Sequence, residues 1–167
     1  MQACAVFVFT LGLFSLFCLR GVLTPSLHAF TANLAHSAGA VLGCLGMPVA
    51  VQFTPGGGVF DAYALVGPRA TLDIADDCNG AWAFAIFVSA VLAVPSPWRA
   101  KAWGLGCGLP ALWGLNLLRV VSLYYIAVCC PSLFMAAHLY VWQFLIIGAA
   151  LLLLAVWVEY GVTPAHA

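Results

Sequence analysis

The chain has 167 residues, of which 65% are hydrophobic and 6% are charged, and its mean hydropathy is +1.11. No soluble domain of this length carries such a composition, so we expect an integral membrane protein with lipid as an obligatory partner. The formal net charge is zero, and no basic tract, acidic tail or RNA-binding signature is present. A nucleic-acid partner is therefore not expected.

Long apolar runs predict the membrane-spanning helices, because a hydrocarbon core of about 30 Å requires about 20 residues. Four runs approach that length: residues 3–19, 80–98, 105–130 and 136–158. The first has the length of a signal-peptide core but has no basic segment before it and no A-x-A site before Arg20, so it predicts a retained anchor helix. A further segment, 27–51, is polar in its first half. It spans the membrane, re-enters it or lies in the interface, and we favour the spanning alternative, which gives five helices instead of four.

The loop between the second and third long runs fixes the expected topology. Residues 95–101 hold Arg99 and Lys101 and no acid, which the positive-inside rule assigns to the cytoplasm as a tight turn. Residues 52–79 then face the exoplasm. This segment holds four of the five acidic residues, and its glycines and alternating apolar residues predict a small extended or hairpin excursion. The expected fold is thus an all-α polytopic bundle of four or five transmembrane helices, forming a single domain over residues 1–167.

Seven cysteines are present without a C-x-x-C pair, and most lie in apolar runs where a thiol behaves as a small hydrophobic group. Cys78 differs, because it lies in a polar stretch where a loop becomes a helix. The N–H groups of a helix N-terminus favour a thiolate, whereas the neighbouring Asp76 and Asp77 disfavour it, so a nearby cation would have to outweigh them. In the alternative interpretation Asp77 and Asn79 only cap the helix and Cys78 is passive.

Arg119 lies within an otherwise uncharged apolar run, where an ionised guanidinium is costly and is usually retained for a site or a buried partner. It follows the cytoplasmic start of its helix by about 21 Å, at 1.5 Å per residue, which places it in the same exoplasmic layer as Cys78. Asn116, one turn earlier, lies on the same helical face. The alternative is a structural salt bridge from Arg119 to Asp76 or Asp77.

His138 begins the last helix just below the exoplasmic surface, where a near-neutral side chain suits proton transfer. Alternatively, it anchors the helix end beside Tyr140 and Trp142 in an aromatic belt. Together with Cys78 and Arg119, it predicts acyl transfer. In this reaction a thiolate attacks a peptide carbonyl, the guanidinium stabilises the oxyanion, and the imidazole moves protons.

At these residues the chain resembles the exosortase and archaeosortase family of membrane cysteine transpeptidases. The resemblance rests on Asp77-Cys-Asn-Gly80, Asn116-Leu-Leu-Arg119 and His138, in this order and spacing, and on the upstream stretch from Thr31 to Val49. It implies Cys78 as the nucleophile, Arg119 as its electrostatic partner and His138 as the third catalytic residue. Asp77, Asn79, Gly80 and Asn116 would be supporting positions.

The resemblance also implies a substrate and a location. The substrates would be exported proteins that end in a recognition motif, a transmembrane helix and a basic cluster, and the enzyme would lie in the bacterial inner membrane with its site facing the exoplasm. The chain is shorter than many members of the family and is similar to exosortase H, which is associated with I-P-T-L-x-x-W-G tails. Its few helices suggest a homodimer or direct entry of the substrate from lipid.

Two other classes of protein remain open at this point. A thiol oxidoreductase would use Cys129 and Cys130, although adjacent cysteines rarely pair without distortion. A non-enzymatic assembly factor or small transporter would use Arg119 and Asn116 to hold helices together or to line a pathway. The histidines and acids show no metal-ligand spacing, so we expect no metal and no cofactor.

Overall fold

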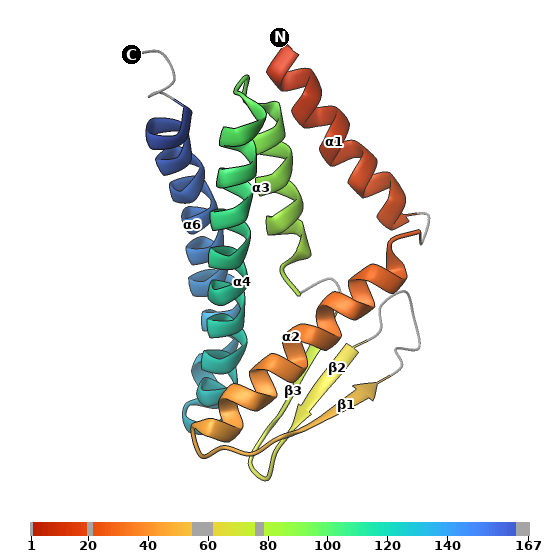
Figure 1. The fold of residues 1–167 in the computed structure, drawn as a ribbon. Coiled ribbons are helices and arrows are strands. Elements are labelled where there is room, and N and C mark those ends of the chain that lie inside the picture. Colours follow the sequence, from red (N-terminus) through yellow and green to blue (C-terminus); the bar gives the residue numbers. More distant parts are fainter. Residues whose placement is uncertain (1, 20–21, 55–61, 76–78, 163–167) are drawn as a thin grey trace. The chain divides into compact units, whose positions relative to one another are not determined.

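The computed structural model describes residues 2–19, 22–54, 62–75 and 79–162 (Figure 1). Its contacts divide the chain into two compact units. The helical unit comprises Met1–Val22, Trp82–Gly114 and Phe144–Ala167, and the sheet unit comprises Leu23–Ala81 and Leu115–Gln143. Because helix α4 (Trp98–Cys129) contributes residues to both units without a break, the expected single domain stays a prediction.

The helical unit is built from α1 (Gln2–Leu19), α3 (Ala81–Ala93), the first half of α4, and α6 (Trp142–Trp157) with its extension η3 (Val158–Val162). Its core is a cluster of four buried side chains from three helices: Phe87 and Val91, Leu112, and Trp157. Helix α1 contacts α3 through an edge-to-face pair of Phe14 and Trp82, whose ring centroids are 5.2 Å apart. Apolar side chains thus hold these helices together.

Two glycines one turn apart allow close helix packing in this unit. Gly104 faces the indole of Trp157, and Gly108 faces the ring of Phe87, so that a Cβ atom at either position would collide with the aromatic ring. Small residues at this spacing let neighbouring helices approach closely, which is how membrane helices gain van der Waals contact. Gly104 and Gly108 therefore belong to the face of α4 that packs against α6 and α3.

The predicted tight turn at residues 95–101 is shorter in the structure, because α4 already begins at Trp98. Lys101 donates a hydrogen bond of 2.6 Å from Nζ to the carbonyl of Leu92, which lies in the last turn of α3. The indole N–H of Trp157 donates to the carbonyl of Ala100 at 2.8 Å. These bonds tie the connection between α3 and α4 to the end of α6.

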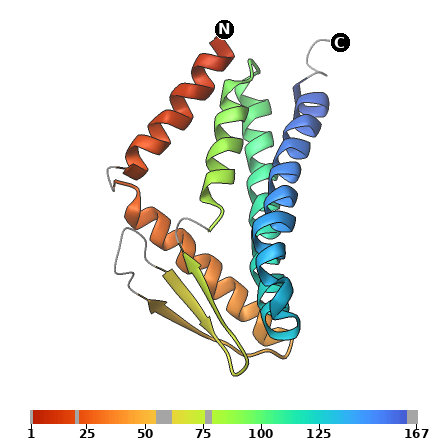
Figure 2. The same ribbon diagram turned by 180° about the vertical axis from the view of Figure 1, so that it is seen from behind.

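The sheet unit places one helix on a small antiparallel sheet. Helix α2 (Thr24–Cys44) lies across one face of strands β1 (Ala50–Thr54), β2 (Ala62–Val66) and β3 (Thr71–Ala75), as the two opposite views show (Figures 1 and 2). The strand order is β1-β2-β3, and the register pairs Val51 with Leu65 and Leu65 with Leu72. Residues 50–54, 62–66 and 71–75 thus form three strands, where a small extended or hairpin excursion was expected.

Helix α2 ends earlier than the predicted segment 27–51. Gly46 has a φ of +80°, Met47 donates its N–H to the carbonyl of Leu42, and Gly46 donates to that of Gly43. This pair of bonds around a left-handed glycine is the Schellman motif, which satisfies the last carbonyls of a helix and stops it. The chain then turns into β1, so residues 45–51 of the predicted segment are not helical.

The chain after α4 makes a short turn before it continues as a helix. Residues Pro131–Leu133 form a 3₁₀ turn (η1), Phe134–Ala136 a single α-turn (α5), and Ala137–Val141 a π-helical turn (η2) that leads into α6. The helical conformation thus begins at Pro131, five residues before the predicted start at 136.

Within the described part of the chain, two continuous helical stretches are long and apolar enough to cross a membrane, Trp98–Cys129 and Pro131–Val162. Two further helices, residues 2–18 and 81–93, are apolar but shorter. The helical character of the prediction is confirmed, whereas the number of four or five spans stays a prediction.

Candidate functional site

Asn79 is the first described residue after Cys78, and its side chain bonds in two directions. Its Nδ2 donates to the hydroxyl of Thr31 on α2 at 2.8 Å, and its Oδ1 accepts the backbone N–H of Ala81 at 2.8 Å. The second bond caps the first turn of α3. Thr31 in turn donates to the carbonyl of Leu27 at 2.9 Å. Because Asn79 is only 1% exposed, these bonds replace water that it cannot reach.

The backbone at this point is held from a third direction by α4. Asn116, which is 2% exposed, donates from Nδ2 to the carbonyl of Asn79. Gly80 has a φ of +87°, and a Cβ atom at this position would come within 2.8 to 2.9 Å of the Asn116 amide group. The turn therefore needs both a left-handed conformation and a missing side chain, and only glycine provides both.

Arg119 lies one turn beyond Asn116 and is 6% exposed, so both side chains belong to the buried face of α4. The hydroxyl of Ser122 donates to the Arg119 carbonyl at 2.9 Å. A guanidinium keeps its charge even where it is largely withdrawn from solvent. The residue that follows Cys78 is thus bonded to the same helix face, one turn away from a buried cation.

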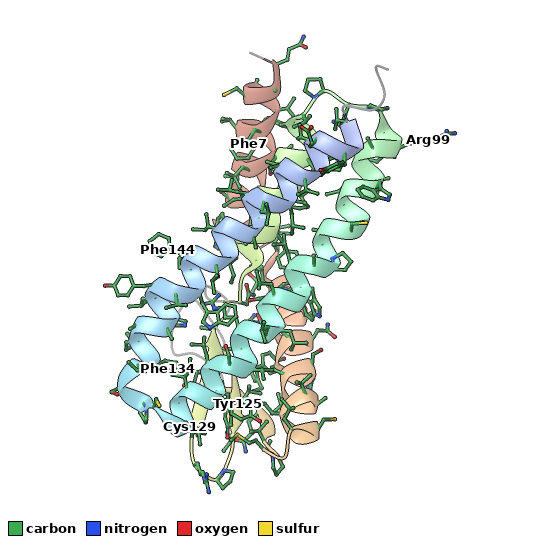
Figure 3. All side chains as sticks on the ribbon, turned by 90° about the vertical axis from the view of Figure 1, so that its left-hand side faces the viewer. Phe7, Arg99, Tyr125, Cys129, Phe134 and Phe144 are labelled. Atoms are coloured by element: carbon green, nitrogen blue, oxygen red, sulfur yellow. The ribbon has the colours of Figure 1, made fainter. Side chains whose placement is uncertain are left out.

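His138 lies in the π-helical turn η2, and the ring of Phe134 stacks on it with 5.8 Å between centroids and 4° between planes. Figure 3 labels Phe134 near the end of α4, where Cys129 is also found. A π-helical turn rotates the side chains that follow it and often marks a functional site. The stacking limits the rotation of the imidazole, which remains half-buried.

Two of the predicted site residues, Asp77 and Cys78, lie outside the described residues, as does Asp76. The structure brings Asn79, Gly80 and Asn116 into direct contact, and it places Arg119 and His138 in the same sheet unit. The catalytic roles assigned to Cys78, Arg119 and His138 remain predictions.

Thr31 is a positioning residue that the sequence analysis did not assign to the site. It is fully buried and shares one face of α2 with Leu34, Ala35, Ala38 and Leu42. The spacing of these residues is the helical repeat of a buried stripe. A polar residue within that stripe is the signal that could have identified Thr31, because a buried hydroxyl usually has a hydrogen-bonding partner.

The backbone held at Asn79 and the buried Arg119 on the adjoining helix face are features of a site for reactions in which a negative charge develops. Amide and hydroxyl groups hold the residue after Cys78, Arg119 supplies a permanent positive charge, and His138 supplies a group that can exchange a proton. Among the residues that the structure describes, no three His, Cys, Asp or Glu side chains gather as metal ligands.

The comparisons with known proteins give one match. The family model described as transmembrane exosortase (Exosortase_EpsH) matches residues 1–156. Neither the curated proteins nor the solved structures give a match. Since the family match covers nearly the whole chain, this membrane protein belongs to the transmembrane exosortase family.

Proposed function

We propose that this protein is a membrane cysteine transpeptidase or protease that cleaves the C-terminal sorting tail of exported proteins. Cys78 is the nucleophile, Arg119 its electrostatic partner and His138 the proton carrier. The observation that carries the proposal is the bond from Asn116 to the Asn79 carbonyl, because it ties the residue after Cys78 to the helix face that bears Arg119. Family membership supports the reaction class.

The reaction proceeds in two steps. The Cys78 thiolate forms a bond to the scissile carbonyl carbon, and Arg119 stabilises the negative charge that develops on the carbonyl oxygen. The carbon–nitrogen bond then breaks, and His138 gives a proton to the leaving amine. In the second step water or the amine of an acceptor attacks the thioester carbon while His138 takes a proton from it. This step releases the thiolate, leaves an acid or a new amide, and restores the protonated His138.

The substrate tail would end in a recognition motif, a transmembrane helix and a basic cluster, and the active site would face the exoplasmic side of the inner membrane. Its transmembrane helix would enter from the lipid, beside this protein or beside a homodimer of it. The exposed apolar surface of the last helix is compatible with such contacts, since Leu152 and Phe144 (labelled in Figure 3) are among its most exposed side chains.

The test is co-expression with a tail-bearing exported protein from the same genome, followed by a gel that separates the full-length form from the processed form. Wild-type protein is expected to process the substrate, whereas Cys78→Ala is expected to abolish processing and still to insert into the membrane. The reason is that a nucleophile contributes chemistry and not packing.

The matched control is Cys107→Ala, because Cys107 is an exposed thiol on α4 that lies in the helical unit. This variant is expected to process the substrate at the wild-type rate. Processing that persists in Cys78→Ala would remove the transpeptidase proposal, and a complete absence of processing by inserted wild-type protein would favour an assembly factor.

A further inference from the structure

The outer edge of β3 has no strand partner among the described residues, because the sheet order is β1-β2-β3. At the turn before β3, Gly67 donates its N–H to the carbonyl of Ala70 at 3.0 Å. Gly67 and Ala70 thus face each other as a hydrogen-bonded pair. Because hydrogen-bonded and non-hydrogen-bonded pairs alternate along an antiparallel ladder, the next pair, Val66 and Thr71, is not hydrogen-bonded. Residues of such a pair direct their N–H and C=O groups away from each other.

The alternation of the ladder then assigns the remaining residues of β3. Leu72 and Ile74 bond to β2, whereas Thr71, Asp73 and Ala75 direct their backbone N–H and C=O groups to the outer edge. No backbone bond joins this edge to another described segment, and the side chains of Thr71 and Asp73 are exposed. Such an edge is a template for an additional strand.

A cavity of about 330 Å³ lies at the start of this edge. It is lined by Ala70 and Thr71 on one side and by Ala127, Pro131 and Phe134 on the other. Thus the beginning of β3 faces the end of α4 and the turn that follows. This cavity is open toward the surface of the molecule, and its lining is mostly apolar.

The cavity is adjacent to the residues of the proposed reaction. Phe134 lines it and also stacks on His138, so the cavity and the proposed proton carrier share one contact residue. At its other end, β3 stops at Ala75, three residues before Cys78. The strand with the free edge therefore begins at the cavity and ends shortly before the proposed nucleophile in the sequence.

We propose that the outer edge of β3 and this cavity bind the recognition motif of the substrate as an added β-strand, with one apolar side chain of the motif in the cavity. The inference rests on the proposed function, since it concerns the peptide that is cleaved. In strand addition the backbone bonds provide affinity and the pockets provide selectivity. The exposed carboxylate of Asp73 disfavours an acidic residue opposite it, so the bound strand is neutral or basic at that position.

Proline substitution tests the edge, because proline removes one N–H and is tolerated on an edge strand where that N–H points outward. Thr71→Pro is expected to raise KM for the tail-bearing substrate about three- to tenfold, which is the effect of one hydrogen bond, and to leave kcat within about twofold. The matched control is Phe53→Pro. By the same alternation Phe53 directs its N–H to the outer edge of β1, so this variant is expected to keep the wild-type KM.

Cross-linking gives a second measurement that requires no cleavage and only a folded chain. In the Cys78→Ala background, p-benzoylphenylalanine at position 71 is expected to cross-link to the substrate motif on illumination, whereas the same group at position 53 is not. Equal KM values for Thr71→Pro and wild type, or equal cross-linking from positions 71 and 53, would overturn the edge proposal alone. An absence of cleavage by wild type would overturn the proposed function, and the cross-link would still decide the binding edge.

Discussion

At Gly80 the backbone φ of +87° and the contact with the Asn116 amide occur in the same residue, two positions after Cys78. A left-handed conformation costs a residue with a Cβ atom about 1 to 2 kcal/mol, wherever it occurs. A side chain at position 80 would also collide with Asn116. The collision would displace the Asn116 amide group that donates to the Asn79 carbonyl. The two effects can be separated by comparing two glycines.

Gly80→Ala is expected to lower processing of the substrate by more than tenfold, because the added methyl group displaces Asn116. Gly46→Ala is the matched control, since Gly46 has a φ of +80° and nothing within 4 Å of the added Cβ. It is expected to lose stability through the same backbone strain and to keep its activity. The measurements are the processing rate and the thermal unfolding midpoint in detergent. Equal loss of activity in both variants would show that strain, and not contact with Asn116, is responsible.

Arg119→Lys is expected to lose most of the processing activity, although it keeps the charge. A guanidinium presents a planar fork of donors that an ammonium group cannot reproduce. The check is the initial rate of tail processing at equal amounts of inserted protein, with Arg99→Lys as the control on an exposed residue of the same helix. Turnover near the wild-type value would mean that Arg119 acts only as a structural charge.

At the level of secondary-structure elements, the site depends on three segments that converge on Asn79. Helix α2 contributes Thr31, the turn before α3 contributes Asn79 itself, and α4 contributes Asn116. Each bond is made where water is excluded, so a partner lost from this network leaves a buried polar group unsatisfied. The network therefore links the stability of the sheet unit to the position of the segment next to Cys78.

Thr31→Val is expected to lower the free energy of unfolding by about 1 to 3 kcal/mol, because Asn79 Nδ2 loses its acceptor in a buried position. It is also expected to lower the processing rate. Thr10→Val is the matched control, since the Thr10 hydroxyl bonds only to carbonyls of its own helix, Val6 and Phe7, in the described structure. Unfolding by denaturant, followed by circular dichroism, measures both variants. A Thr31→Val value equal to that of Thr10→Val would contradict the network.

The sequence predicted where the apolar helices lie, because their signal is length and composition. It extended the second run five residues past the end of α3 at Ala93 and began the third seven residues after the start of α4 at Trp98. The predicted end of α2 was too late, because the apolar residues around Gly46 and Pro48 were assigned to the helix. Gly46 and Pro48 are themselves a recognisable signal for the end of a helix. The number of strands was not predicted, although β2 and β3 are joined by a short turn at Gly67–Ala70, because the alternating residues of 52–79 were assigned together to one small excursion. Asn79, Gly80 and Asn116 were identified as a group, whereas Thr31 requires knowledge of which face of α2 is buried.

On the scale of the whole molecule, α4 is longer than the membrane core requires. Its 32 residues span about 48 Å at 1.5 Å per residue, compared with a core of about 30 Å. The ends of the helix therefore extend into the interfaces or the helix tilts. Exposed Arg99 lies in its first turn, and Cys129 and Cys130 are exposed at its other end.

The predicted topology places these two ends on opposite sides of the membrane. In a variant whose other five cysteines are replaced by serine, a membrane-impermeant maleimide added to intact cells or spheroplasts is expected to label Cys129 and Cys130, and the signal should disappear when these two are also replaced by serine. Arg99→Cys in that variant is expected to react only after the cytoplasmic side is opened. Labelling of Arg99→Cys from outside would reverse the orientation and place the site in the cytoplasm.

The groups around Cys78 are synthesised in a fixed order, because α4 follows Cys78 in the chain. The hydrogen bond from Asn116 to Asn79 joins residues that are 37 positions apart, and Arg119 is made later still. A nascent chain that stops before Leu115 already contains Cys78, yet it has none of the α4 groups that fix the neighbouring backbone. The ribosome thus synthesises Cys78 before Asn116 and Arg119. A fragment released before α4 is complete is therefore expected not to process the exported proteins that are the proposed substrates.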